Sequence, residues 1–169
     1  LEMIDKTKKS TVVFSENWHK GVVGIVASRL IETHYKPTIV LSENNGILTG
    51  SARSVHDFDL YKAISKCAHL CENFGGHKYA AGLSIKKDNL DEFIIQFEKV
   101  VTETISKDQL FPKINIDMII DIEEVNDNLF RILQQFSPFG PKNLPPIFVS
   151  TRVVDNGYGK KIGKDQSHL

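Results

Sequence analysis

The 169 residues carry 21 basic and 21 acidic side chains, so the net charge singles out neither a polyanion nor an acidic partner. No apolar run approaches the ~18 residues of a membrane span, and we therefore expect no membrane association. With 41% hydrophobic residues, a chain of this length can bury one full domain core and part of a second.

The two cysteines, Cys67 and Cys71, stand four residues apart, where they would share one face of a helix and a disulfide would restrain nothing. Neither a Cys-x-x-Cys pair nor a Cys/His cluster is present, so the sequence predicts no metal site in this chain. Free thiols without a signal peptide predict a cytoplasmic protein. Because the chain begins at Leu1 rather than Met, we interpret it as a piece of a longer protein.

The first half of the chain alternates strand and helix patterns. Residues 11–16 form a short strand pattern, and apolar residues then recur at helical spacing over 21–35. Two further strand patterns, 38–42 and 47–51, flank Asn44-Asn45-Gly46, which is a strong hairpin signal. This β-α-β-β order predicts an α/β fold in which helices flank a mixed β-sheet.

Two more helices and a strand are predicted next. Asp59 can cap a helix that runs to about Asn73, where Gly75-Gly76 would stop it. Small residues over 79–85 predict a strand. Asp88 then caps the most regular helix, which ends near Ser106 and carries one apolar stripe. The stripe consists of Leu90, Phe93, Ile94, Phe97, Val100, Val101 and Ile105.

A domain boundary is predicted near Asp108, which divides the chain into residues 1–108 and 109–169. Beyond it, strand patterns over 114–122 and 147–154 enclose a short helix over 126–136 and a proline-rich turn or linker over 137–146. This order predicts the start of a small, β-rich domain.

The first candidate site is the sequence GSARS at residues 50–54, at a predicted strand end. Because side chains alternate along a strand, Ser51 and Arg53 point the same way and make a one-sided phosphate clamp, with the guanidinium as a planar donor fork. Ser54 adds a second hydroxyl. Over residues 50–87, six basic residues stand against three acidic ones, which favours a polyanion ligand. The alternative is a surface arginine beside a strand-ending serine.

The second candidate is GGHKYAAG at residues 75–82. Paired glycines, Gly75 and Gly76, let a backbone approach a ligand closely and direct its N–H groups at an anion. His77 can donate to a phosphate or transfer a proton, and Lys78 adds a cation beside it. The alternative is a helix C-cap followed by a solvated histidine.

The third candidate is WHKGVVG at residues 18–24, where a helix begins. A helix N-terminus can bind an anion, and His19 and Lys20 could add donors there. Trp18 could stack on a base, but we favour its interpretation as a hydrophobic staple for the helix.

These motifs, residues 18–30 (WHKGVVGIVASRL), 50–54 (GSARS) and 74–82 (FGGHKYAAG), follow one another in the order and spacing of the DHH-associated domain. That is the second domain of the DHH-superfamily phosphoesterases, and the sequence resembles the RecJ family of single-strand-specific exonucleases within it. The segment 136–148 also resembles the entry of that family into an oligonucleotide-binding (OB) domain.

The resemblance implies the nucleic-acid-gripping part of a 5′→3′ exonuclease of DNA repair and recombination. Its Mn or Mg ions would be bound by a DHH domain outside this chain, so the chain alone is expected to be inactive. The implied partners are single-stranded DNA with a 5′ end, a single-strand-binding protein and a helicase. His77 would be catalytic, and the phosphate-binding residues would be Ser51, Arg53, Ser54, Gly75, Gly76, His77, Lys78 and His19.

Three alternatives stay open. The first is another DHH-family enzyme, an oligoribonuclease or a cyclic-dinucleotide phosphodiesterase, in which a third glycine usually stands where Phe74 is found here. The second is a non-catalytic RNA-binding module like the C-terminal domain of alanyl-tRNA synthetase. The third is a purely structural domain.

Overall fold

The structure is a computed structural model that describes residues 5, 7–154 and 157–160. The chain forms two compact units, Leu1–Pro112 and Lys113–Leu169. The boundary predicted near Asp108 lies shortly before this division.

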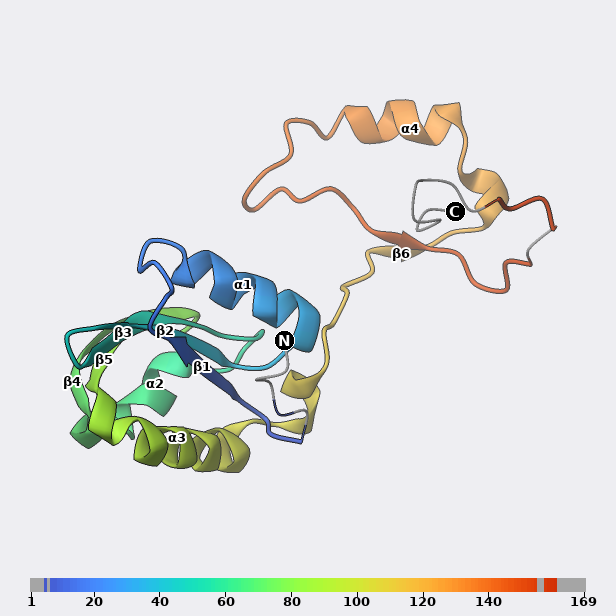
Figure 1. The fold of residues 1–169 in the computed structure, drawn as a ribbon. Helices are drawn as coiled ribbons and strands as arrows, with labels where there is room; N and C mark the ends of the chain where they lie inside the picture. The colour runs from blue at the N-terminus through green and yellow to red at the C-terminus, as the bar shows by residue number, and fades with distance from the viewer. Residues whose placement is uncertain (1–4, 6, 155–156, 161–169) are drawn as a thin grey trace. The chain divides into compact units, whose positions relative to one another are not determined.

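The first unit is built on a five-stranded sheet with the strand order β1-β2-β3-β5-β4 (Figure 1). β1 is parallel to β2, and the other neighbouring pairs are antiparallel, so the predicted mixed sheet is confirmed. The strands span Thr11–Ser15 (β1), Thr38–Asn44 (β2), Ile47–Arg53 (β3), Cys71–His77 (β4) and Ala80–Lys86 (β5).

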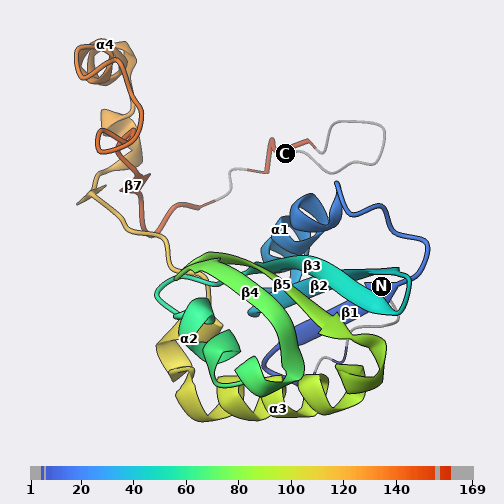
Figure 2. The ribbon, with the colours of Figure 1, turned by 90° about the vertical axis from the view of Figure 1, so that its left-hand side faces the viewer.

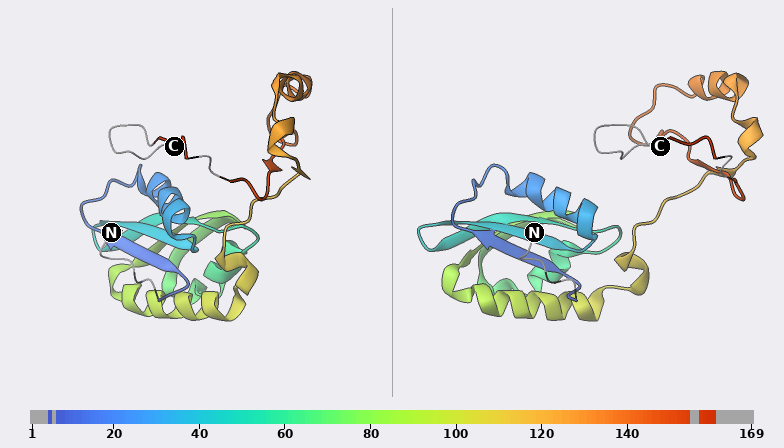
Figure 3. Two further views of the ribbon diagram at one scale, coloured as in Figure 1. Left: turned by 90° about the vertical axis from the view of Figure 1, so that its right-hand side faces the viewer. Right: turned by 45° about the vertical axis from the view of Figure 1, so that its right-hand side comes forward.

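Helices cover both faces of this sheet. α1 (Val23–His34) packs on one face, over β2 and β3, whereas α2 (Leu60–Ser65) and α3 (Leu90–Thr104) lie on the other, as the views in Figures 2 and 3 show. The predicted arrangement of helices flanking a mixed sheet is therefore present in this unit.

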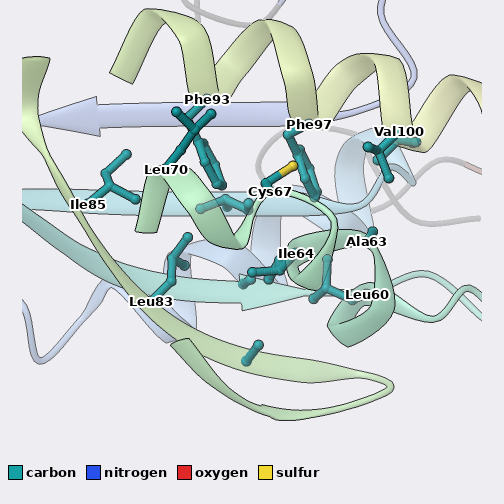
Figure 4. Packing of buried hydrophobic residues seen from close by; sticks show 14 of the residues in the cluster. Leu60, Ala63, Ile64, Cys67, Leu70, Leu83, Ile85, Phe93, Phe97 and Val100 are labelled. Atoms are coloured by element: carbon teal, nitrogen blue, oxygen red, sulfur yellow. The ribbon is translucent and has the colours of Figure 1, made fainter. Parts of the chain in front are cut away.

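The main core lies between the sheet and the helices α2 and α3. Figure 4 shows Phe93 and Phe97 of α3 facing Ile64 and Cys67, and both rings are fully buried and stacked 5.9 Å apart. Burial of each such side chain contributes about 1.5–3 kcal/mol. The predicted apolar stripe of α3 is thus the side of the helix that packs on the core.

A smaller cluster forms between α1 and the opposite face of the sheet. It consists of Val13, Val23, Ala27 and Val40, with Trp18 packed against it at its border. Trp18 therefore takes part in the packing around α1, and its interpretation as a hydrophobic staple stays a prediction.

Local chemistry explains one hairpin turn and the start of one helix. Asn45 and Gly46 both have positive φ, 53° and 77°, which is the conformation that a two-residue hairpin between β2 and β3 requires. Asp59 caps α2 by accepting the backbone N–H of Lys62 at 3.0 Å, as predicted.

Two predictions for this unit are wrong. The helix that begins after Asp59 ends at Ser65, and Cys71 to Asn73 belong to β4, because this segment pairs with β5 rather than continuing the helix. Cys67 and Cys71 therefore do not share a helix face. Asp88 does not cap α3, since it lies in a short 3₁₀ turn and the residue before the helix is Asn89.

The second unit contains little regular structure in the part that the structure describes. α4 (Asp127–Gln134) is capped by Asn126, whose side chain accepts the N–H groups of Asn128 and Leu129. The strands predicted over 114–122 and 147–154 shrink to β6 (Met118–Ile119) and β7 (Phe148–Val149), which pair in parallel. Among the described residues, the rest of these two alternating segments has no partner strand with which to pair.

Among the helices that the structure describes, none has the length and apolar character of a membrane span.

Candidate nucleic-acid interface

The surface of interest lies on β3, β5 and β4, on the face of the sheet that carries α1. Side chains alternate along a strand, and the buried residues Leu48, Ala52 and Leu83 point toward α2 and α3. Their sequence neighbours therefore point to the face on which α1 lies. We call the solvent-facing positions of these three strands the open face.

The strand register places the predicted site residues in two adjacent rows across the open face. In one row Ser51 of β3 is opposite Gly82 of β5, which is opposite Gly75 of β4. In the next, Arg53 is opposite Ala80, and Ala80 is opposite His77. Since neighbouring strands are about 4.8 Å apart, the backbones of Arg53 and His77 lie roughly 10 Å from each other. The structure thus brings Ser51, Arg53, Gly75 and His77 together on one surface.

Arg53 and Ser51 form a fixed pair. The guanidinium Nη1 donates to Ser51 Oγ at 2.6 Å and to the carbonyl of Ala52 at 2.9 Å. This contact orients the planar fork and leaves Nη2 and Nε without a protein acceptor among the described residues. Because Ser51 Oγ accepts from Arg53, its own O–H is available to donate. The pair therefore presents several donors to an anion.

The first turn of α1 lies directly against this pair. A Cβ built on Gly24 would be 3.1 Å from Arg53 Nη2 and 3.4 Å from Ser51 Oγ. The N-cap residue, Val22, makes no side-chain cap bond, and no acidic residue occupies the first turn. The helix therefore contributes backbone N–H groups and positive potential beside the guanidinium, both of which favour a bound anion.

His77 stands at the far end of its row and is exposed to solvent. Its Nδ1 accepts the backbone N–H of Tyr79 at 3.3 Å. In the neutral ring the proton must then be on Nε2, which becomes a donor. His19 is arranged in the same way, because its Nδ1 accepts the N–H of Gly21 at 3.1 Å, but it lies in the exposed loop before α1.

The two adjacent glycines differ in their surroundings. They do not end a helix, as the sequence suggested, but lie in β4. Gly76 has φ of +145°, and a Cβ there would be 2.3 Å from the carbonyl oxygen of Ala80, so the fold itself requires a glycine. A Cβ on Gly75 would meet nothing within 4 Å. Gly75 therefore leaves free space on the open face that no packing among the described residues demands.

Two predicted phosphate ligands are engaged in local structure. Ser54 Oγ donates to the carbonyl of Phe58 at 2.8 Å, and the Lys78 ammonium pairs with Asp57 at 3.0 Å. The hydrogen bond from Lys78, followed by the charge of His56, lowers the pKa of Asp57 below its ordinary value. These contacts join the loop after β3 to the β4–β5 turn, and they leave Ser54 and Lys78 less available to a ligand than Ser51 and Arg53.

No group of three or more His, Cys, Asp or Glu side chains that could hold a metal ion occurs among the described residues. Asp57, in the loop beyond the end of β3, is already paired with Lys78 and His56. The described residues therefore do not fit a hydrolytic metal centre.

Sequence reasoning included Gly24 and Gly82 in its candidate motifs but did not name them as site residues. Gly24 allows α1 to approach Arg53, and Gly82 continues the side-chain-free strip between Ser51 and Gly75. The signal for Gly82 was present in the sequence, because the period of two in 79–85 places Gly82 opposite in direction to the apolar Ala81 and Leu83. For Gly24 no sequence signal was available, since only the crossing of α1 over β3 brings it to Arg53.

These features define an α/β domain with a mixed sheet, one face of which carries a cluster of anion donors. The chain belongs to the DHHA1 domain family, whose model matches residues 7–103, and the model of the RecJ OB domain matches residues 116–169. The family resemblance that the motifs indicated is therefore confirmed.

Relatives and a solved structure agree with this assignment. The chain is 31% identical along its whole length to the single-stranded-DNA-specific exonuclease RecJ of Bacillus subtilis, and 30% identical to that of Haemophilus influenzae. It covers only 22% and 32% of these two relatives. The crystal structure of RecJ from Thermus thermophilus in complex with Mn²⁺ matches 85% of the chain with a TM-score of 0.74 and 25% identity, over 21% of that protein.

Proposed function

We propose that this chain is the nucleic-acid-gripping portion of a 5′→3′ single-stranded-DNA exonuclease that acts in DNA repair and recombination. The observation that carries the proposal is the convergence of Ser51, Arg53 and His77 on one open face beside the N-terminus of α1. The names of the relatives, which are single-stranded-DNA-specific exonucleases, support the substrate class.

Each residue is assigned a role that its contacts support. Arg53, held by Ser51, presents Nη2 and Nε to the 5′-terminal phosphate or its neighbour, and the Ser51 hydroxyl donates to the same group. His77 donates from Nε2 to the scissile phosphoryl oxygens, where negative charge develops during hydrolysis. His77 is accordingly the proposed catalytic residue, and Gly75 lets the nucleic acid approach the sheet.

The hydrolytic metal, Mn or Mg, is proposed to lie outside the described residues, since these do not fit a metal centre. Solved structures of RecJ from Thermus thermophilus contain Mn²⁺ or Mg²⁺. The further proposed partners are a single-strand-binding protein and a helicase, and the proposed location is the cytoplasm.

Binding of 5′-phosphorylated oligothymidine to this chain tests the proposal. Arg53→Ala should weaken binding about tenfold or more, because a hydrogen bond to a charged group contributes about 1.5–3 kcal/mol. The slope of log affinity against log salt should fall by about 0.7, the value for one phosphate contact on a single strand. Fluorescence anisotropy at several salt concentrations measures both quantities.

The matched control is Arg29→Ala. Arg29 is exposed on α1 and pairs only with Glu32 among the contacts that the structure describes, so its loss removes the same charge away from the open face. If Arg53→Ala and Arg29→Ala weaken binding equally, Arg53 is not a phosphate ligand and the proposed site is wrong.

A further inference from the structure

A third row of side chains continues the open face away from Arg53 and His77. Thr49 of β3 lies opposite Ser84 of β5, and Ser84 lies opposite Asn73 of β4. Thr49 and Asn73 are exposed and Ser84 is half-buried. None of these three side chains makes a hydrogen bond with any residue that the structure describes, so two hydroxyls and an amide face outward together.

The charge along this face favours a polyanion. No acidic residue occurs in the three rows that run from Arg53 and His77 to Thr49, Ser84 and Asn73. One step further along β5 on the same face, Lys86 carries an ammonium group whose side chain is 60% exposed, with Glu72 at 3.6 Å. From Ala80 to Lys86 the strand extends about 20 Å. A basic residue thus stands at each end of a neutral polar surface, Arg53 at one end and Lys86, paired with Glu72, at the other.

The surroundings of the phosphate site leave this direction open. α1 packs over β2 and β3, but Thr49, at the other end of β3 from Arg53, is exposed. At the end of β3 beyond Arg53, the loop and the hairpin are joined by the N–H of Ser54 donating to Tyr79 and that of Leu60 donating to Lys78, both at 3.0 Å. Each end has a paired carboxylate, Asp57 with Lys78 beyond Arg53 and Glu72 with Lys86 at the other end. The backbone contacts close the sheet beyond Arg53, whereas the rows toward Lys86 stay open to a strand gripped at Arg53.

We infer that the open face is a track for the nucleotides next to the gripped phosphate in single-stranded nucleic acid. Thr49, Ser84 and Asn73 form an uncharged subsite that hydrogen-bonds to sugars or bases, and Lys86 contacts a phosphate further along the strand. Gly82 and Gly75, which carry no side chains, let the strand lie close to the sheet between the two sites. This inference rests on the proposed function of the Arg53 and His77 site, and extends that site along the sheet.

The test compares two ligands, a 5′-phosphorylated dinucleotide and a 5′-phosphorylated oligothymidine of about ten nucleotides, a length typical of single-strand sites. Asn73→Ala and Thr49→Val should each weaken binding of the longer ligand about fivefold, the effect of one net hydrogen bond, without changing the salt slope. Lys86→Ala should lower that slope by about 0.7. None of these changes should affect the dinucleotide, which reaches only the Arg53 site.

Lys99→Ala is the matched control, because Lys99 is an exposed lysine on α3, on the opposite side of the sheet. Thr49→Val keeps the β-branched shape, and circular dichroism checks that each variant is folded. Chemical-shift changes on the unaltered chain give an independent map of the contacted residues.

Three results would overturn the inference. If Arg53→Ala weakens binding of both ligands but the track variants match Lys99→Ala, the track is wrong and the phosphate site stands. If the track variants weaken the dinucleotide as much as the longer ligand, they act on the phosphate site and there is no separate subsite. If neither ligand binds, or Arg53→Ala changes nothing, the proposed function fails together with the inference.

Discussion

The two glycines of the Gly-Gly-His motif should respond in opposite ways to the same substitution. Gly76→Ala forces a residue with a Cβ into φ of +145° and places that Cβ 2.3 Å from the carbonyl oxygen of Ala80. A forced backbone conformation costs about 1–3 kcal/mol and the overpacking about as much again, so the free energy of unfolding should fall by roughly 2–6 kcal/mol. The Cβ of Gly75→Ala meets no atom within 4 Å, so this substitution should raise the free energy of unfolding by about 0.4–1 kcal/mol.

Urea unfolding followed by the fluorescence of Trp18 separates these outcomes. Trp18 is the single tryptophan of the chain and packs in the first unit, so its signal reports on the sheet domain. With a denaturant dependence of about 1–3 kcal/mol per M, Gly76→Ala should lower the midpoint by roughly 1 M or more. Gly75→Ala should keep or raise the midpoint and still weaken binding of oligothymidine, because its methyl group occupies the open face.

Two results would contradict these expectations. If Gly76→Ala unfolds at the same urea concentration as the unaltered chain, the left-handed backbone at this position is not a requirement of the fold. If Gly75→Ala is stable and binds oligothymidine as well as the unaltered chain, the free space above Gly75 is not where the ligand lies.

Two further predictions concern stability and pH. Asp59→Ala should lower the free energy of unfolding by about 1 kcal/mol, because the N-cap bond to Lys62 is lost. The same bond lowers the pKa of Asp59, so its stabilising contribution is present above pH ~4 and is lost as the pH falls. Urea midpoints at pH 3 and 7 will show this loss. Burial raises the pKa of Cys67 to about 11, so this thiol should resist alkylation at pH 8 in the folded chain. The free energy of unfolding should fall as the pH rises from ~8.5, where the thiol of the unfolded chain ionises, toward 11. Cys67→Ala should remove this part of the loss of stability at alkaline pH. An equal loss of stability in the variant would contradict the assignment of the effect to Cys67.

The parts of the fold that the sequence predicts are those in which local chemistry and burial agree. The Asn45-Gly46 turn needs positive φ at both residues, and the stripe from Leu90 to Val101 has only one side that can face a core. Local signals and tertiary packing therefore select the same structure at these positions.

The β4 segment could not be predicted, because its strand conformation comes from pairing. Residues 71–77 (CENFGGH) have no alternating apolar pattern and a single strong strand former, Phe74, and glycine is unfavourable in a strand. They are extended because β5 offers a partner edge from Ala80 to Ile85. The same pairing moves Gly75 and His77 from a predicted helix end to the open face, so the geometry of the candidate site could not be derived from the motif alone.

Arg53→Lys separates the geometry of the phosphate grip from its charge. One nitrogen of the Arg53 guanidinium holds Ser51 Oγ at 2.6 Å, which leaves the other donors of the same planar group for the ligand. A lysine ammonium carries the same charge on a flexible stem, but it cannot hold Ser51 and bind a phosphate in one fixed plane. Arg53→Lys should therefore keep the salt slope of the unaltered chain and lose about three- to tenfold in affinity, with Arg53→Ala losing both.

The Arg29→Lys variant, which changes the same side chain on the outer side of α1, provides the baseline for this measurement. An intermediate affinity at an unchanged salt slope would mean that the fork and the charge contribute separately. Full affinity in Arg53→Lys would mean that a point charge suffices. The contact between Arg53 and Ser51 would then serve only the strand end, and phosphate recognition at this position would need only the positive charge.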